Sequence, residues 1–174
     1  MNLDYKEYYS IKDYEKWEGD WELIYGEPYA MSPSPSISHQ RLEKKILLQL
    51  DEGLQKCSQC EALSEVDWSV SNDTIVRPDV LVACDIQGEK LTVTPEIIVE
   101  VISPSTARRD ELLKFELYEN EGVGIYILVY PDEKKAKVYR LVNGHYLKAG
   151  DFNQSTFKFN IGSCALSLNF SDIW

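Results

Sequence analysis

The sequence predicts a single α/β (α+β) domain with helices against one mixed β-sheet. Two segments with helical periodicity alternate with apolar runs typical of strands, in the order helix, three strands, helix, two strands. That mixture favours an α/β sandwich. A length of 174 residues is most simply one domain, residues 1–174, and is long enough to bury a substantial core.

Residues 1–37 are expected to form an N-terminal extension made of a helix and a hairpin. In SIKDYEKWEG (10–19), Ser10 lies three residues before Asp13 and a glycine ends the segment, which is typical of a short capped helix. The following WELIYGEPYAM predicts two short strands that turn near Tyr25 and Gly26.

The rest of the predicted domain alternates between helices and strands. The sequence SHQRLEKKILLQLDEGL (38–54) predicts the first core helix, and TARRDELLKFELYENEG (106–122) predicts a second that ends at its glycine. Asn72 and Asp73 predict a tight hairpin between the first two strands. The predicted strands are 61–71, 74–85, 95–103, 124–130 and 135–143.

Composition and charge exclude several classes of protein. No apolar run approaches the roughly 20 residues of a membrane helix, and the start MNLDYKEYYS lacks the pattern of a secretion signal, so we expect a cytoplasmic protein with no membrane partner. A formal net charge of −11 argues against a broad basic surface for nucleic acid, although a local basic patch is compatible with it.

The chain also lacks the motifs of several enzyme classes. It has no GxxxxGK[ST] phosphate loop, no GxGxxG after a strand, no HExxH and no GxSxG. The two histidines, His39 and His145, are too few for a histidine-rich metal site and argue against a Ser-His-Asp triad.

Four cysteines are expected to be free thiols, because a reducing cytoplasm disfavours disulfides. Cys57 and Cys60 form a CxxC, but no second CxxC and no histidine pair lies at the spacing that completes a zinc site. The other two cysteines are Cys84 and Cys164.

A glutamate interrupts the apolar run IIVEVI at position 100. Burying an unpaired carboxylate costs several kcal/mol or forces it to take up a proton, so Glu100 requires a partner. Asp79 interrupts the preceding strand in IVRPDVLVA. If the two strands are neighbours, the two carboxylates can meet, and Mg²⁺ or Mn²⁺ would relieve their repulsion. Alternatively, one of them reaches solvent at a strand end or pairs with Arg77 or Arg109.

The second core helix carries a lysine inside its apolar arc. Lys114 lies one turn after Asp110, and the two side chains are compatible with a helix-surface pair worth a few tenths of a kcal/mol. The functional alternative places Lys114 near the strand carboxylates, where it would orient or help to deprotonate a water molecule or stabilise charge on a phosphate.

Two polar residues lie within the apolar arc of the first core helix. His39 is at the helix start, where a polar residue is common. Glu43, one turn further, is the better candidate for an additional acidic site residue. Ser103, Ser105 and Arg109, near the start of the second helix, are candidates for binding a phosphate because free backbone N–H groups there favour anions.

Three segments resemble the Uma-two family of restriction-endonuclease-like proteins, within the PD-(D/E)XK nuclease superfamily. The resemblance covers about residues 13–145 and is most specific in VEVISPST followed by Asp110, Lys114 and Tyr118. It implies a restriction-endonuclease-like fold, with a central mixed sheet flanked by helices. The three segments are RPDVLVACD, PEIIVEVISPSTARRDELLKFELYENEGVGIYILVYPDEKKAKVYRL and WELIYGEPYAMSPSPSISHQRL.

The resemblance implies roles for individual residues. Asp79 and Glu100 match the two metal-binding carboxylates. The superfamily lysine normally follows two residues after the second carboxylate, where this chain has Ile102. In some members a lysine from the next helix replaces it, which matches Lys114. Glu43 matches a helix glutamate that joins the site in some members. A further acidic residue, Glu22, is similar to a recurring family position.

Two functional hypotheses follow. The first is a Mg²⁺- or Mn²⁺-dependent nuclease that acts on nucleic acid, DNA in preference to RNA. Its catalytic residues would be Asp79, Glu100 and Lys114, and a homodimer would present two such sites to a duplex. The second is a catalytically inactive nuclease-fold module that binds or acts as a scaffold. Ile102 at the usual lysine position, the acidic net charge and the absence of a recognisable DNA-reading domain motivate it, and Arg77, Arg109 or Lys114 would then satisfy the carboxylates in place of a metal.

Overall fold

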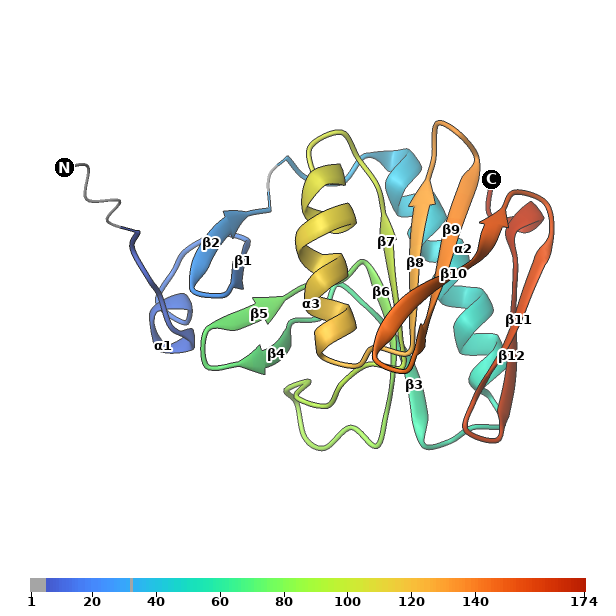
Figure 1. Cartoon of the computed structure of the whole chain (residues 1–174), viewed down its shortest axis with the longest axis horizontal. Coiled ribbons are helices and arrows are strands. Elements are labelled where there is room, and N and C mark those ends of the chain that lie inside the picture. Colours follow the sequence, from blue (N-terminus) through green and yellow to red (C-terminus); the bar gives the residue numbers. More distant parts are fainter. Residues whose placement is uncertain (1–5, 32) are drawn as a thin grey trace.

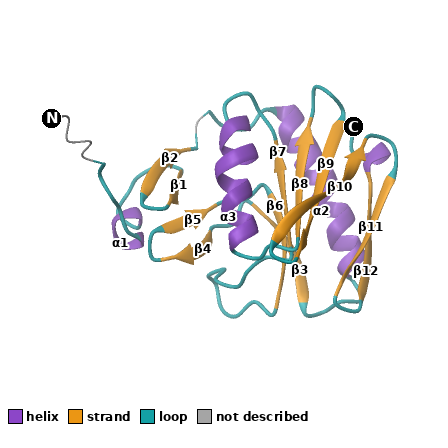
Figure 2. Ribbon diagram, in the orientation of Figure 1, coloured by secondary structure: helices purple, strands orange, loops and turns teal. Residues whose placement is uncertain are grey.

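The computed structural model describes residues 6–31 and 33–174 and is built around a six-stranded mixed sheet (Figures 1 and 2). The strand order is β10-β9-β8-β7-β6-β3, in which β7 and β8 pair in parallel and the other neighbours are antiparallel. This confirms the predicted central mixed sheet. Its strands are β3 (Cys60–Ser64), β6 (Val80–Cys84), β7 (Ile97–Val101), β8 (Ile125–Tyr130), β9 (Lys135–Val142) and β10 (His145–Phe152).

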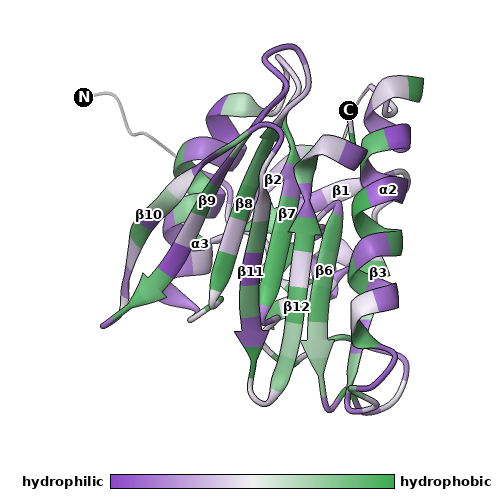
Figure 3. Cartoon of the chain, turned by 90° about the vertical axis from the view of Figure 1, so that its right-hand side faces the viewer, coloured by the Kyte–Doolittle hydropathy of each residue, from purple (hydrophilic) through white to green (hydrophobic). Residues whose placement is uncertain are grey.

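Each face of this sheet has its own apolar core. Helix α2 (Ile37–Leu54) and the hairpin of β11 (Thr156–Ile161) and β12 (Cys164–Asn169) cover one face, beside the apolar strands β6 and β7 in Figure 3. Helix α3 (Lys114–Asn120) covers the other face. Because side chains alternate along a strand, Ile98 of β7 packs toward α3 while its neighbours Ile97 and Val99 pack toward α2.

A second sheet, which the sequence does not predict, joins the N-terminal hairpin to the core. Its strand order is β2-β1-β5-β4. The predicted turn at Tyr25 and Gly26 is confirmed, with φ values of 52° and 77°. Helix α1 ends well before the predicted Gly19. The elements are α1 (Ile11–Tyr14), β1 (Trp21–Ile24), β2 (Glu27–Ala30), β4 (Trp68–Ser71) and β5 (Thr74–Val76).

The predicted continuous strands 61–71 and 74–85 are wrong, because each is divided between the two sheets. Glu65, with φ of 51°, follows the end of β3, and Pro78, which has no N–H to give to a sheet, lies between β5 and β6. The two breaks lie side by side, because the N–H of Glu65 donates a hydrogen bond to the carbonyl of Asp79. Asp79 therefore lies just before β6, outside the ladder.

The predicted ends of the other core elements agree with the structure to within a few residues. Gly122, with φ of 82°, ends the second core helix as expected. That helix has a π turn, Arg109–Leu113, immediately before α3. Beyond residue 143 the structure contains β10, β11, β12 and a short 3₁₀ helix, Phe170–Asp172, none of which was predicted. Among the described residues, no helix combines the length and apolar character needed to cross a membrane.

The expectation of four free thiols is wrong, because the structure pairs all four cysteines. Cys57 bonds to Cys164 and joins the end of α2 to β12, while Cys60 bonds to Cys84 across β3 and β6. The pairing brings together segments 107 and 24 residues apart. Sequence spacing did not reveal it, because sheet register and the position of the C-terminal hairpin create the proximity.

Reduction of the disulfides should destabilise the protein. A cross-link restricts the unfolded chain more when it closes a longer loop, so breaking Cys57–Cys164 should lower the free energy of unfolding by about 2–4 kcal/mol, and breaking Cys60–Cys84 by about 1 kcal/mol less. Urea unfolding of the C57S/C164S and C60S/C84S variants measures both effects. Equal unfolding midpoints in wild type and both variants, or four reactive thiols in the untreated native protein, would contradict the pairing.

Candidate active site

Asp79 and Glu100 lie opposite each other where β6 and β7 meet. The register pairs Val80 with Val99, so the next pair along the two strands is Asp79 and Glu100. The Asp79 N–H donates to Glu100 Oε2 at 3.4 Å, and Asp79 Oδ2 accepts a 2.6 Å hydrogen bond from the N–H of Val101. The strands are thus neighbours, as the sequence argument required.

Lys114 projects from the start of α3 toward the same point. Its Nζ lies 3.0 Å from Glu100 Oε1, 2.7 Å from Glu22 Oε1 and 3.6 Å from Asp110 Oδ1. Tyr118, one turn later on α3, donates a 2.9 Å hydrogen bond to the same oxygen of Glu100. Glu100 therefore directs one oxygen toward the helix and the other toward Asp79.

This group of charges is almost completely buried. The side chains of Lys114, Glu22, Glu100 and Asp110 are each between 1% and 4% exposed. An unpaired charge in such a position would be very costly, whereas a charge with close partners of opposite sign is tolerated. The arrangement excludes the alternative in which Asp110 and Lys114 form a solvent-exposed helix pair.

Burial and charge shift the pKa values of this group in opposing ways. Burial by itself lowers the pKa of the Lys114 ammonium, but Glu100, Glu22 and Asp110 outweigh it and raise the pKa well above its usual value. Burial raises the pKa of the Glu100 carboxyl, against the opposing effect of Lys114, and raises that of Asp110 to about 6. Lys114 is consequently positively charged at neutral pH.

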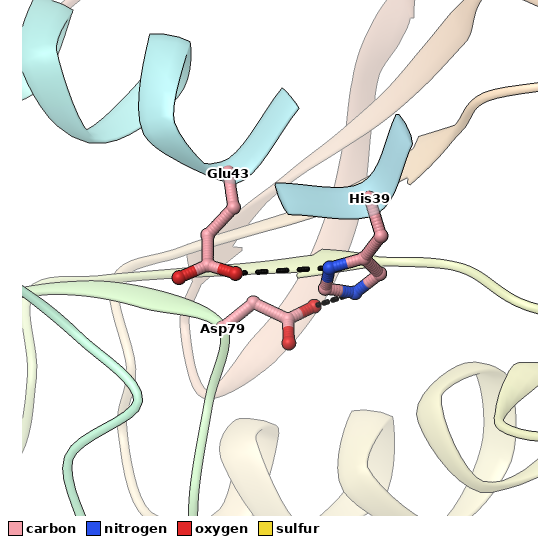
Figure 4. Close-up of side chains that lie close together, drawn as sticks. All are labelled: His39, Glu43 and Asp79. Carbon is pink, nitrogen blue, oxygen red and sulfur yellow. Dashed lines mark ion pairs between the residues drawn. The ribbon is translucent and has the colours of Figure 1, made fainter. Parts of the chain in front are cut away.

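On the other side of Asp79 lie the two polar residues of α2. His39 Nε2 is 3.2 Å from Asp79 Oδ2, and its Nδ1 is 3.7 Å from Glu43 Oε2 (Figure 4). The three side chains offer ligand atoms that all lie within 4.8 Å of one another. His39 Nδ1 is buried and has no hydrogen-bond partner among the residues that the structure describes, while Glu43 accepts a 3.0 Å hydrogen bond from Gln40. This trio is a second possible donor set for a cation, sharing Asp79 with Glu100.

The pKa values of this trio also depart from their usual ranges. Burial, together with the charges of Glu65 and Asp79, raises the pKa of Glu43 to about 7. Burial alone would lower the pKa of His39, but hydrogen bonding and attraction to Asp79 raise it above the usual value. Protons therefore compete with any cation for these two groups near neutral pH.

A cleft of about 470 Å³ contains most of the predicted site residues. Glu43 is not part of its lining. The cleft walls carry more carboxylates than cations: Arg77, Arg109 and Lys114 face seven acidic residues. The predicted residues that line it are Glu22, His39, Asp79, Glu100, Ser103, Ser105, Arg109, Asp110 and Lys114.

The candidates for phosphate binding lie at one wall of the cleft. The hydroxyls of Ser103 and Ser105 are 3.1 Å apart, and Thr106, which sequence reasoning missed, is also within 3.1 Å of Ser103 Oγ. Arg109 forms a 3.0 Å ion pair with Glu22. Ile102 lines the cleft as well, and its N–H donates to the carbonyl of Val129.

Arg77 and Arg109 do not form ion pairs with Asp79 or Glu100 in the described structure, so the alternative in which an arginine neutralises these carboxylates is wrong. Arg77 pairs with Asp20 and Asp67, each at 2.7 Å, and Arg109 pairs with Glu22. Sequence reasoning assigned no partner role to Tyr118, although its spacing of four residues from Lys114 on a helix was a usable signal.

Three comparisons relate the chain to known proteins. The Uma2 family model, described as "Putative restriction endonuclease", matches residues 6–157. The uncharacterized protein slr1290 of Synechocystis is 30% identical over 141 residues, which cover 75% of this chain and 73% of that protein. A crystal structure described as a putative nuclease belonging to DUF820, from Anabaena variabilis, has a TM-score of 0.77 at 17% identity and covers 95% of this chain and 97% of that one. The last comparison confirms the predicted restriction-endonuclease-like fold.

Proposed function

The chain belongs to the Uma2 family, a nuclease-like family, and we propose that it hydrolyses phosphodiester bonds in nucleic acid with the help of Mg²⁺ or Mn²⁺. The observation that carries this proposal is the convergence of Asp79, Glu100 and Lys114 in one cleft from three different elements. Two carboxylates beside a permanently charged lysine are the groups that metal-assisted phosphoryl chemistry requires.

The donors around Asp79 fit a hard divalent cation. Glu100 Oε2 faces Asp79, and His39 and Glu43 approach Asp79 from α2. The buried Nδ1 of His39, which has no hydrogen-bond partner among the described residues, is available as a metal ligand. Carboxylate oxygens suit both Mg²⁺ and Mn²⁺, and an added imidazole is a ligand that a transition-metal ion accepts more readily than Mg²⁺ does. Asp79 and Glu100 would be the principal ligands, with Glu43 and His39 beside them.

A bound Mg²⁺ or Mn²⁺ would supply Lewis-acid stabilisation of the phosphate and activation of water. Lys114 cannot act as a general base at neutral pH, because its neighbours keep it protonated. Its contribution is a fixed positive charge for the negative charge that develops on the phosphate. Ser103 and Ser105 offer hydroxyl donors to a second phosphate oxygen at the cleft wall.

The charge of the cleft makes the cation necessary for substrate binding. Seven acidic side chains and only three lysine or arginine side chains line the cleft, so a phosphate would meet net repulsion. A divalent ion held by Asp79 would reduce that repulsion. DNA as the substrate and a second copy of the chain as a partner remain predictions from the sequence.

Hydrolysis by the wild-type protein tests the proposal directly. We expect it to cleave single- or double-stranded DNA in millimolar Mn²⁺ or Mg²⁺ and to lose all cleavage in EDTA, with RNA tested in parallel. Gel analysis of end-labelled oligonucleotides measures the rate. Absence of cleavage on every substrate, with metal binding confirmed by calorimetry, would contradict the enzyme hypothesis.

Metal binding should depend on pH because protons occupy the same donors. The pKa of Glu43 is raised to about 7, so its carboxyl holds a proton at pH 6 and is ionised at pH 8. The imidazolium of His39, whose pKa is also raised, likewise loses its proton as the pH rises. Mn²⁺ affinity should therefore rise by about tenfold between pH 6 and pH 8. Calorimetry on wild type and Glu43→Gln measures this. The variant should show a smaller pH dependence, and an equal one would remove Glu43 from the site.

The binding or scaffold hypothesis has one specific observation in its favour. Lys114 already satisfies Glu100 at 3.0 Å, so the site is partly neutralised without any metal. Under this hypothesis, Mn²⁺ at millimolar concentration would not bind, and nucleic acid would bind, if at all, equally well in EDTA. Measurement of both separates the two hypotheses.

A further inference from the structure

Glu22 is a buried carboxylate whose two oxygens both have partners, and it has no role in the mechanism proposed above. It belongs to β1, in the N-terminal hairpin, yet its side chain is 1% exposed and reaches the helix that follows β7. Its Oε1 lies 2.7 Å from Lys114 Nζ and accepts a 2.8 Å hydrogen bond from the N–H of Arg77. Its Oε2 accepts a 3.0 Å hydrogen bond from Arg109. One carboxylate thus joins two cations of the cleft.

The π turn explains how both cations reach the same side chain. Arg109 and Lys114 are five residues apart, which in a regular α-helix would separate them by about 140° around the axis. In the π turn the N–H of Lys114 instead bonds to the carbonyl of Arg109, so the two residues lie almost one above the other. Such turns are rare and are frequently found at functional sites. From Lys114 onward the helix is regular, so Tyr118 remains on the same side as Lys114.

The same contacts fix the direction of the Lys114 ammonium. An ammonium has three N–H donors. Glu22 and Glu100 lie 2.7 and 3.0 Å from Nζ and occupy two of them, whereas Asp110 at 3.6 Å is beyond hydrogen-bond range. The third donor remains for a group in the cleft, which Lys114 lines.

The hairpin holds Arg109 in a comparable way. The guanidinium lies 5.2 Å from the ring centre of Tyr29, in β2, and donates a 3.5 Å hydrogen bond to the carbonyl of Ala30. Together with Glu22, these contacts orient Arg109 from the N-terminal hairpin. The hairpin therefore contributes to the site and is more than an addition to the fold.

We propose that Glu22 is a positioning residue, which directs the free N–H of Lys114 and the guanidinium of Arg109 toward a phosphate oxygen in the cleft. The π turn at 109–113 is the feature that lets one carboxylate hold both. The inference rests on the proposed phosphodiesterase function for the identity of the phosphate, but the positioning of Lys114 can be tested without any substrate.

The experiment compares Glu22→Gln with wild type by NMR of protein labelled with [¹⁵N]lysine. A buried, hydrogen-bonded ammonium exchanges its protons slowly, so Lys114 should give a protected Nζ signal, assigned by its absence in Lys114→Arg, which keeps a positive charge among the buried carboxylates. We expect Glu22→Gln to increase the exchange rate of this signal by about tenfold or more. Glu116→Gln, which removes an exposed carboxylate two residues from Lys114, is the matched control and should leave the rate unchanged.

A kinetic comparison distinguishes positioning from a purely structural ion pair. Glu22→Gln should lower kcat for DNA cleavage by about 10- to 100-fold, with KM changed by less than about threefold, because the bound phosphate meets misdirected cations. A residue that only fastens the hairpin would change the unfolding midpoint and leave the kcat of the folded enzyme unaltered. Should Glu22→Gln not fold, Glu22→Asp retains the charge but withdraws it by one methylene, and should produce a smaller increase in exchange.

Unchanged Lys114 exchange in Glu22→Gln, or in Glu22→Asp if only that variant folds, would overturn the proposal. So would wild-type kcat in either folded variant. If the wild type cleaves no nucleic acid while Lys114 exchange still responds to Glu22, the phosphodiesterase function fails and the positioning of Lys114 stands. The two failures are therefore distinguishable.

Discussion

Asp79→Asn should lose Mn²⁺ binding and reduce DNA cleavage by about 10³-fold or more. Asp79 is the one carboxylate that both donor sets share, since Glu100 adjoins it on β7 and His39 and Glu43 approach it from α2. Asparagine has nearly the same shape, and its oxygen can still accept the hydrogen bond from Val101, so the fold should be retained. The change removes one negative charge from the proposed metal site and little else.

Calorimetry and the cleavage assay measure the two effects on one preparation. Asp51→Asn is the matched control, because Asp51 is exposed near the end of α2, away from the cleft, and carries the same charge. Asp79→Asn that binds Mn²⁺ with wild-type affinity would place the metal elsewhere. Cleavage that survives in this variant would remove Asp79 from the catalytic residues.

Lys114→Met should be strongly destabilised and inactive. The substitution leaves Glu22, Glu100 and Asp110 buried without the cation that lies among them. Removal of one partner from a buried ion pair typically lowers the free energy of unfolding by about 3–5 kcal/mol. Urea unfolding measures the change. Lys44→Met, at an exposed position of α2, should change it by no more than about 0.5 kcal/mol.

The loss of stability in Lys114→Met should depend on pH. Burial already raises the pKa of Glu100 and Asp110 in the folded protein, and loss of the ammonium, which opposes that rise, will raise both further. In the unfolded chain these carboxyls titrate near pH 4. The folded variant therefore binds more protons than the unfolded chain, and its stability should increase as the pH falls from 8 to 5. If the free energy of unfolding of Lys114→Met is as far below that of the wild type at pH 5 as at pH 8, the loss of stability comes from lost packing and not from unpaired charge.

Local chemistry made several elements predictable. The period of apolar residues identified both core helices and the strands of the central sheet, and the turns at Tyr25–Gly26 and Asn72–Asp73 were evident from their residues. These signals depend on neighbours in the chain, so one sequence is sufficient to see them. The breaks near Glu65 and Pro78 were missed, because transfer of a hairpin from one sheet to another is decided by what each half packs against.

For the candidate site, too, some features were predictable from the sequence and others were not. Glu100, Asp79 and Lys114 stood out because each is a charged residue within an apolar pattern, and a charge in such a place needs a partner wherever it lies. The sequence did not show which cation would pair with the strand carboxylates. Arg77 and Arg109 were equally reasonable candidates for the strand carboxylates, but the structure pairs both with other acidic residues.

The sequence by itself determined the class of fold, the family and the charged residues that the core must accommodate, since periodicity and burial cost act through residue type. Tertiary structure alone decided that Glu22 of the N-terminal hairpin holds Lys114, that His39 and Glu43 lie beside Asp79, and that the four cysteines pair. These contacts join residues from 24 to 107 positions apart, apart from His39 and Glu43 on one helix turn. They depend on sheet register, on where strands end and on a single π turn, and no local pattern encodes distances between such elements.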